Sequence, residues 1–173
     1  CERPLEGLRV IEMGQLLAGP FTGTILAYFG AEVIKVEPPG GDPIRGWREV
    51  RDGTSLWYRS LGRNKKSVTL DLKTEQGRAL ARRLLETADV VVENFRPDVK
   101  RRLGIDYKAL AKINPKLVYG SISGFGQTGP YADRAGYDFI IQGMGGFMSV
   151  TGERDDLPGG GPQKAGIAIT DLM

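Results

Sequence analysis

Residues 8–20 read LRVIEMGQLLAGP, a mostly apolar run that stops at a glycine and enters a loop of small and amide residues. Leu8–Met13 does not alternate strictly between apolar and polar residues, since Val10 and Ile11 are adjacent, and this is typical of a strand buried on both faces of a parallel sheet. Gly14–Pro20 predicts a turn, and Phe21–Phe29 predicts a short amphipathic helix that ends at Gly30. A strand, a turn and a helix in this order indicate the first unit of an α/β fold.

The same alternation continues along the chain. Further strands are predicted at Glu32–Glu37, Ser67–Leu72, Val90–Glu93, Leu117–Ser123 and Ala165–Thr170. Further helices are predicted at Glu75–Thr87, with Thr74 as its cap, and at Asp98–Leu103, Tyr107–Asn114 and Phe139–Val150. Residues 42–62 are expected to be irregular. Strands and helices at this spacing predict a doubly wound parallel sheet of the α/β class.

The composition limits the chemistry that the chain can supply. Its 173 residues contain no His, so neither a Ser-His-Asp relay nor an imidazole metal ligand can come from them. Cys1 is the only cysteine, which excludes an internal disulfide and a cysteine zinc site. Catalysis by this chain therefore has to use carboxylates, amides, hydroxyls, lysines or backbone N–H groups, and we expect no metal site.

Charge and hydropathy indicate the kind of partner. A net charge of +3 is too small to indicate nucleic acid, although the excess Lys and Arg could serve an anionic small molecule. No apolar run approaches the roughly 18 residues of a membrane helix, and no apolar signal stretch opens the chain. We expect no nucleic-acid or membrane partner, and a cytoplasmic protein or, in a eukaryote, one of the mitochondrial matrix.

The loops after the predicted strands are rich in Gly, Pro, amide or charge, and the last one begins at Asp171. In an open parallel sheet, ligands bind outside the carboxyl ends of the strands, so these loops predict one composite site. Lys73, Arg96 and Arg102 follow two of the strands and could contact phosphates, although a solvated helix face is an equally open interpretation for Lys73 and Arg102. Other basic residues are expected on a solvated helix face (Arg78, Arg82, Arg83) or before the third strand (residues 63–66).

Residues 124–129, GFGQTG, match the dinucleotide-binding pattern G-x-G-x-x-G. Pro130 and Asp133 follow the glycines, where a nucleotide site needs an apolar-periodic helix to present its N-terminus. We therefore interpret the segment as a glycine-rich turn.

Asp171 has two interpretations. A carboxylate at a strand end can cap the next helix through its side-chain oxygen. It can also attack an activated carbonyl, because carboxylates serve as covalent nucleophiles. Spacing alone leaves both open.

Six blocks of the sequence, taken in order, resemble one known family. They are LEGLRVIEMGQLLAGP, FGAEVIKVEPPGGDPIRGW, RNKKSVTLDLKT, ADVVVENFRP, SISGFGQTGPYADRAGYD and GIAITDL. Together they are similar to the N-terminal part of the class III coenzyme A transferases, the group of formyl-CoA and carnitine CoA-transferases and α-methylacyl-CoA racemases. The resemblance implies a Rossmann-like open sheet within a two-domain fold that forms an interlocked homodimer. Residues 1–173 would be the N-terminal part of the CoA-binding large domain, without the small domain and the C-terminal return.

The resemblance also implies the site. Asp171 takes the place of the family nucleophile, with acyl-CoA and a carboxylic acid as substrates and no tightly bound cofactor. The positions implied to bind CoA are Leu16, Leu17, Ala18, Leu70, Asp71, Leu72, Lys73, Asn94, Phe95, Arg96, Arg102, Leu103, Tyr137 and Asp138. The chain departs from the family pattern at Pro38 and Ala135, where some transferases offer an arginine and a lysine.

Two alternatives to a transferase remain. The racemases of the family use a His–Asp pair, and the segment that would hold this His reads Gly136-Tyr137-Asp138 here. A tyrosine ordinarily titrates near pH 10 and is a poor base near neutrality, which favours a transferase over a racemase or epimerase. A non-catalytic CoA-binding protein would need the loops but not the acid.

Overall fold

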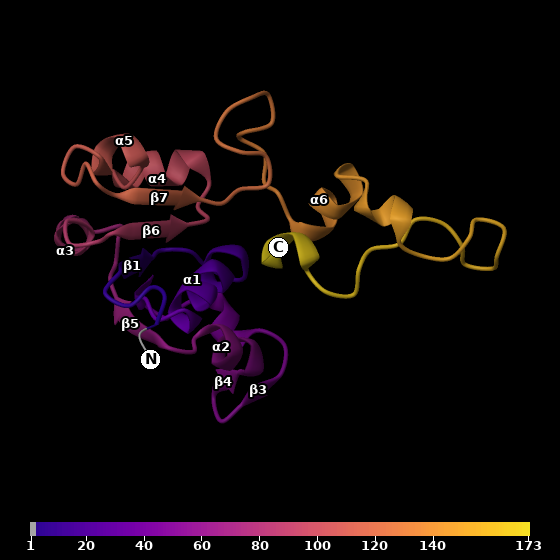
Figure 1. The fold of residues 1–173 in the computed structure, drawn as a ribbon, viewed down its shortest axis with the longest axis horizontal. Coiled ribbons are helices and arrows are strands. Elements are labelled where there is room, and N and C mark those ends of the chain that lie inside the picture. The colour runs from indigo at the N-terminus through magenta and orange to yellow at the C-terminus, as the bar shows by residue number, and fades with distance from the viewer. Residues whose placement is uncertain (1–2) are drawn as a thin grey trace. The chain divides into compact units, whose positions relative to one another are not determined.

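A computed structural model describes residues 3–173, so Cys1 lies outside the described residues. The chain divides into two units, residues 1–122 and residues 123–173, and each is described by itself. Figure 1 shows the elements of both units and labels those for which there is room.

The first unit is built on a five-stranded sheet of order β5-β2-β1-β6-β7, in which every neighbouring pair is parallel. The strands are β1 (Arg9–Glu12), β2 (Glu32–Glu37), β5 (Lys65–Thr69), β6 (Val90–Glu93) and β7 (Val118–Ser121). The chain winds from β1 outward through β2 to β5, and then returns to the other side of β1 for β6 and β7. This arrangement confirms the predicted doubly wound sheet and places a topological switch point beside β1.

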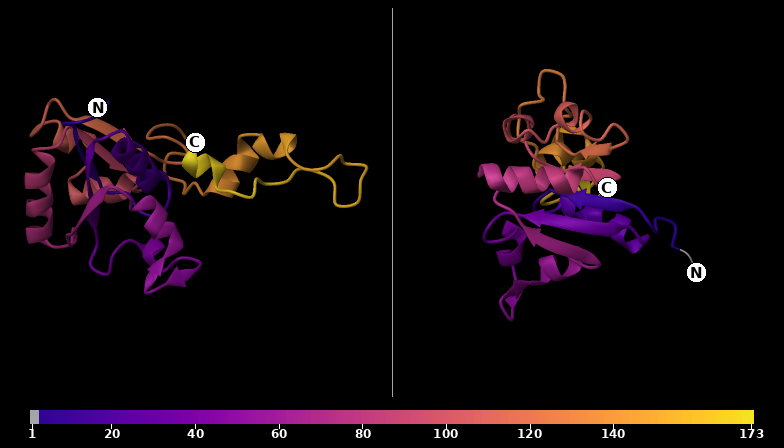
Figure 2. Two further views of the ribbon diagram at one scale, coloured as in Figure 1. Left: turned by 60° about the horizontal axis from the view of Figure 1, so that its bottom comes forward. Right: turned by 90° about the vertical axis from the view of Figure 1, so that its left-hand side faces the viewer.

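Helices cover both faces of this sheet, as can be followed in Figure 2. The central strands send alternate side chains to opposite faces, since successive residues of a strand point in opposite directions. Val10 and Val92 pack with residues of α1 (Ala18–Tyr28) in one cluster. Ile11 and Val91 pack in another, with residues from α3 (Glu75–Leu85) and from around α4 (Pro97–Leu103) and α5 (Tyr107–Leu110). The consecutive apolar residues of β1 therefore reflect burial on both faces, as predicted.

Two local predictions for the helices are confirmed. The Thr74 hydroxyl accepts the N–H of Gly77 at 3.0 Å and caps α3. Gly30 follows α1 with a φ of +105°, a conformation that glycine adopts without steric cost. Helix α1 begins at Ala18, earlier than predicted, because a proline in the first turn has no N–H to leave unpaired.

Residues 42–62 were expected to be irregular, and this was wrong. They form the 3₁₀ turn η1 (Pro43–Gly46), the hairpin strands β3 (Val50–Arg51) and β4 (Thr54–Ser55), and α2 (Leu56–Leu61). The Asp42 and Ser55 side chains accept N–H groups at the starts of η1 and α2. The caps stabilise two helical turns that are too short to show a periodic apolar pattern.

The third sheet strand is displaced from its prediction. It begins at Lys65, so Lys65 and Lys66 belong to it rather than precede it, and it ends at Thr69 rather than Leu72. Asp71 explains the early end, because its side chain accepts the N–H of Lys73 at 3.0 Å and its carbonyl accepts the N–H of Thr74. Such local bonds compete with a strand ladder and make residues 70–73 a loop.

The second unit contains α6 (Asp138–Met144), η2 (Phe147–Val150) and α7 (Ile169–Leu172). The single helix predicted over Phe139–Val150 is broken at Gly146, whose φ is +79°. The strand predicted over Ala165–Thr170 is wrong, since this segment is irregular with a bend until α7 begins at Ile169. Residues 124–129 form turns without a helix directly after them, in agreement with the glycine-rich turn.

No helix within residues 3–173 is long and apolar enough to cross a membrane.

Candidate active site

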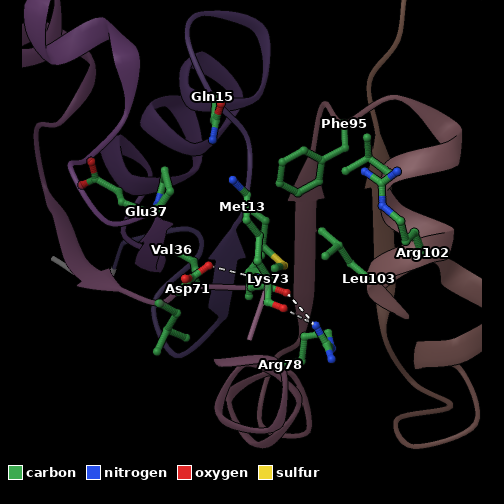
Figure 3. Close-up of a pocket in the computed structure, with 14 residues that line it drawn as sticks. Met13, Gln15, Val36, Glu37, Asp71, Lys73, Arg78, Phe95, Arg102 and Leu103 are labelled. Carbon is green, nitrogen blue, oxygen red and sulfur yellow. Dashed lines mark hydrogen bonds between the residues drawn. The ribbon is translucent and has the colours of Figure 1, made fainter. Parts of the chain in front are cut away.

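A pocket of about 330 Å³ opens where β5, β2, β1 and β6 end. Figure 3 shows the side chains that line it, which come from the end of β2, from the strand-end loops and from α3 and α4. They are Met13, Gln15, Val36, Glu37, Pro38, Leu70, Asp71, Leu72, Lys73, Arg78, Phe95, Val99, Arg102 and Leu103. The pocket lies at the edge that the strand-end argument predicts for ligands.

Half of the residues implied to bind CoA line this pocket, namely Leu70, Asp71, Leu72, Lys73, Phe95, Arg102 and Leu103. Met13 and Val36, which the sequence reasoning missed, add to the apolar part of the pocket wall. Phe95, Leu70 and Leu72 also pack against the buried cluster of the sheet, which fixes their positions. A wall of this kind suits an aromatic ring or an apolar chain.

Three cationic side chains border the pocket, namely Lys73, Arg78 and Arg102. The prediction for Arg78 was wrong. Arg78 was expected on a solvated helix face. Its Nη1 instead donates to the carbonyl of Lys73 at 2.8 Å and to that of Leu72 at 3.3 Å. Side chains of a helix point back toward its N-terminus, so a long residue in the first turn of α3 reaches the preceding loop. Arg78 thus joins Lys73 and Arg102 around the pocket.

The two carboxylates of the pocket are already engaged. Asp71 accepts the N–H of Lys73 within its own loop. Burial alone would raise the pKa of Glu37, but hydrogen bonds from Arg45, Ser67 and the Asp42 N–H outweigh it and lower that pKa to about 2. Glu37 and Arg45 therefore neutralise one another. Lys73, Arg78 and Arg102 then outnumber the remaining carboxylate of the lining, Asp71, so the pocket favours an anion.

The other implied CoA contacts of the first unit lie beside the pocket rather than in its lining. Arg96 is exposed and lies 3.4 Å from Asp98, with which it forms an ion pair. Leu16 and Leu17 lie in the connection from β1 to α1, and Ala18 is the first residue of α1. Asn94 uses its side-chain amide on the backbone of Gln15, at 2.8 Å and 2.9 Å.

Asp171 is the third residue of α7, in the second unit, and it is half-buried. Of its two interpretations, the helix cap is wrong, because Ala168 occupies the cap position and provides no side-chain acceptor. The carboxylate of Asp138, the first residue of α6, instead accepts hydrogen bonds from the first turn of α7. Its Oδ1 accepts the backbone N–H of Thr170 at 2.8 Å and the Thr170 hydroxyl at 2.7 Å.

Gln142 holds the rest of this segment. It is fully buried, and its amide donates to Asp138 at 2.6 Å and to the Ile167 carbonyl at 3.3 Å. Its oxygen accepts the N–H of Ala165 at 2.9 Å. Gln142, on α6, thus hydrogen-bonds the N–H of Ala165 and the carbonyl of Ile167. These two backbone groups have their partners without a neighbouring strand, which is consistent with the absence of a strand at residues 165–168.

The two neighbouring acids have opposite environments. Burial alone would raise the pKa of Asp138, but hydrogen bonds from Thr170, from Gln142 and from the Asp171 N–H outweigh it and lower that pKa. Burial, followed by the charge of Asp138, raises the pKa of Asp171. A carboxylate that is poorly solvated and close to another negative charge is more basic, and therefore a better nucleophile.

Tyr137 is exposed and stacks on Phe139, with ring centroids 6.3 Å apart. Tyr137 and Asp138 therefore lie in the second unit, on the segment that contacts the Asp171 helix, and not in the lining of the pocket. Within residues 3–173 no group of three or more His, Cys, Asp or Glu is arranged to hold a metal ion.

The fold and the pocket define a protein with a Rossmann-like sheet and a strand-end site for a ligand that is apolar in part and anionic in part. The chain matches CoA-transferase family III over residues 5–173, and it belongs to that family. It is 55% identical to the succinate–glutarate CoA-transferase of Agrobacterium fabrum, over 98% of this chain and 44% of that protein. It is 42% identical to the human succinyl-CoA:glutarate CoA-transferase, over 98% of this chain and 38% of that protein.

A solved structure agrees with this assignment. A CAIB/BAIF family protein from Brucella suis superposes with a TM-score of 0.91 at 49% identity, over 99% of this chain and 46% of that one. The chain spans less than half the length of the curated relatives named above.

Proposed function

We propose that this chain belongs to an enzyme that moves coenzyme A from an acyl-CoA donor to a carboxylic acid acceptor. Membership of the transferase family over residues 5–173 is the observation that carries the proposal. The pocket supports it, because CoA combines phosphates, an aromatic base and a flexible pantetheine arm. Lys73, Arg78 and Arg102 suit the phosphates, while the wall around Phe95 suits the base or the arm.

The proposed reaction uses Asp171 as a covalent nucleophile. A carboxylate oxygen of Asp171 attacks the thioester carbonyl of the donor, the carbon–sulfur bond breaks, and a mixed anhydride and a CoA thiolate form. The thiolate then attacks the aspartyl carbonyl, which releases the donor acid as a carboxylate and leaves an aspartyl-CoA thioester. The acceptor carboxylate then attacks the aspartyl-CoA thioester, which gives a mixed anhydride of Asp171 with the acceptor and frees the CoA thiolate. The thiolate attacks the acceptor carbonyl of this anhydride, which forms the new acyl-CoA and restores the Asp171 carboxylate. No proton has to be transferred in any of these steps, which fits a chain without histidine.

Dicarboxylic acids are the substrates that we propose. The relatives at 55%, 51% and 47% identity carry the names succinate–glutarate, succinyl-CoA–D-citramalate and acetyl-CoA:oxalate CoA-transferase. Each of these names contains at least one dicarboxylic acid. We accordingly expect succinyl-CoA as donor and a short dicarboxylate as acceptor.

We also propose that residues 1–173 belong to a CoA-binding large domain that works together with a small domain in an interlocked homodimer. The second domain is supported by the coverage, since this chain covers 44% and 46% of the bacterial relatives that it matches. The interlocked homodimer rests on the family resemblance alone. The acid-binding groups would then come from the remaining length.

The test uses the complete protein with succinyl-CoA and a panel of dicarboxylates. Wild type should transfer CoA, while Asp171→Ala should lose transfer and still bind CoA in a calorimetric titration. An Asp171→Ala variant that still transfers CoA would contradict the nucleophile assignment. A wild-type protein that binds CoA but transfers it to no acid would favour a non-catalytic CoA-binding protein.

A further inference from the structure

The connection from β1 to α1 contains a strained residue beside the pocket. Leu16 has a φ of +64°, in the left-handed region, where the Cβ of any residue other than glycine crowds the backbone. Arg48, Asp52 and Asn64 also have positive φ values, but they lie in exposed turns. Leu16 instead is partly buried and directly follows Gln15, which lines the pocket. Strain of this kind persists only where the surroundings impose it, and it clusters at functional sites.

One side of the strained turn is held by Asn94, from the loop after β6. The Gln15 N–H donates to Asn94 Oδ1 at 2.8 Å, and Asn94 Nδ2 donates to the Gln15 carbonyl at 2.9 Å. Two glycines make room for this approach, because a Cβ on Gly14 or Gly19 would lie 2.7 Å or 3.1 Å from Asn94 Oδ1. The backbone of Gln15 is therefore fixed at both of its polar groups.

The other side is held by Asp42, from the loop after β2. The Leu16 N–H donates to Asp42 Oδ1 at 3.1 Å, so the carboxylate contacts the strained residue itself. Asp42 is 1% exposed and cannot shift easily, because Oδ1 also accepts the N–H of Ile44 and its own N–H donates to Glu37. This carboxylate is thus a fixed acceptor in front of Leu16.

Lys35 connects Asp42 to the end of β1. Its Nζ lies 2.8 Å from Asp42 Oδ2, as an ion pair rather than an aligned hydrogen bond, and it donates to the Gly14 carbonyl at 3.0 Å. The same ammonium pairs with Glu12 at 2.8 Å, and all three charged groups are almost completely buried. A buried charge network with this geometry is strongly disturbed when one partner is removed.

We propose that Asp42, anchored by Lys35, is a positioning residue that imposes the left-handed conformation on Leu16 and so fixes the loop that meets CoA. Gln15 is the group most directly affected, since it borders the pocket and its side-chain amide has no hydrogen-bond partner among residues 3–173. The inference rests on the proposed function, because it takes CoA as the ligand of the pocket.

The test is a double-mutant cycle between Asp42 and Leu16, read out as the dissociation constant for CoA in the complete protein. Asp42→Ala should weaken CoA binding about tenfold, which corresponds to about 1.4 kcal/mol. Leu16→Gly removes the steric penalty of the left-handed conformation. Adding it to Asp42→Ala should therefore restore affinity by about threefold, whereas in wild type it should bring no gain. Asp155→Ala, at an exposed acid, is the matched control.

A purely structural role of Asp42 predicts a different result. In that case Leu16→Gly would not restore binding in the Asp42→Ala background, and the proposal would be overturned. Unchanged CoA affinity in Asp42→Ala would overturn it as well. If Asp42→Ala does not fold, Asp42→Asn retains an acceptor for the Leu16 N–H but loses the charge. Asp42→Asn should lose less CoA affinity than is expected for Asp42→Ala, and adding Leu16→Gly should recover part of that loss. If Leu16→Gly recovers none of the lost affinity, the proposal is contradicted.

The two proposals fail in different ways. A wild-type protein without affinity for CoA would contradict the proposed function before any variant is made. If wild type binds CoA but the effects of Asp42→Ala and Leu16→Gly on CoA affinity are simply additive, only the positioning role is contradicted.

Discussion

Asp138 accepts the backbone N–H of Thr170 at 2.8 Å, and this contact holds one carboxylate against the helix that carries another, Asp171. The hydrogen bonds keep Asp138 ionised, because they lower its pKa. The charge of Asp138 then adds to burial in raising the pKa of Asp171. The same side chain therefore caps the helix and tunes the proposed nucleophile.

The pH profile of transfer should reveal this relationship. The carboxylate form of Asp171 is the reactive one, so kcat/KM should fall as the pH drops through its raised pKa. Asp138→Asn keeps an oxygen for the Thr170 N–H and removes the charge, which should move the acid limb to lower pH. Asp155→Asn, at an exposed acid, should leave the limb in place. An acid limb at the same pH in Asp138→Asn and in wild type would contradict the claim that the charge of Asp138 helps to raise the pKa of Asp171.

Gln142 should contribute to both stability and rate. Gln142→Leu removes its bonds to Asp138, Ile167 and Ala165, and buried polar groups left unpaired cost about 1–3 kcal/mol each. Thermal unfolding should show a lower Tm, and kcat should fall more than CoA affinity because the Asp171 segment loses its support. Gln76→Leu, at an exposed position on α3, is the control. Equal Tm values for the two variants would show that Gln142 does not hold the segment.

Arg78 and Arg102 should each strengthen CoA binding. Charge-assisted hydrogen bonds to phosphate are worth about 1.5–3 kcal/mol, so Arg78→Gln or Arg102→Gln should weaken binding at least about tenfold. Arg83→Gln, on the exposed side of α3, should have little effect. Comparing CoA with 3′-dephospho-CoA shows whether the arginine contacts the 3′-phosphate. If it does, its Gln variant should bind the two ligands with more similar affinities than wild type does. Unaltered CoA binding in Arg78→Gln would return this residue to a purely structural role.

Glu37 should make the first unit sensitive to acid. Its pKa is lowered from 4.5 to about 2, so the stability that it contributes is complete above pH 4.5 and is lost as the pH falls toward 2. The linkage is on the order of 3 kcal/mol. Denaturant unfolding of wild type and Glu37→Gln across this range measures it, and the variant should show the flatter dependence. Parallel curves would mean that Arg45 and Ser67 do not stabilise the ionised form.

The sequence predicted what depends on local order, such as the strands and the loops at their ends. The alternation of elements put Lys73 and Arg102 at the strand-end edge, and both line the pocket there. Leu70 and Leu72 were instead predicted as part of the third strand, which ends at Thr69. Arg78 was misplaced because the periodicity of α3 gives its face but not the reach of a long side chain around the first turn.

Contacts between distant residues were not predictable. GIAIT has the composition of a strand, but Asp138 and Gln142 hold it by hydrogen bonds as a bend and a helix. In the same way, nothing local in EVIKVE indicates that Lys35 is buried between Glu12 and Asp42. The catalytic assignment of Asp171 came from the family resemblance and remains a proposal.

The most direct test of the account is mass spectrometry of the complete protein incubated with succinyl-CoA and then treated with hydroxylamine. The account predicts a hydroxamate on the peptide that contains Asp171, and its absence in Asp171→Asn. Turnover of labelled thioester with an unmodified Asp171 peptide would contradict it.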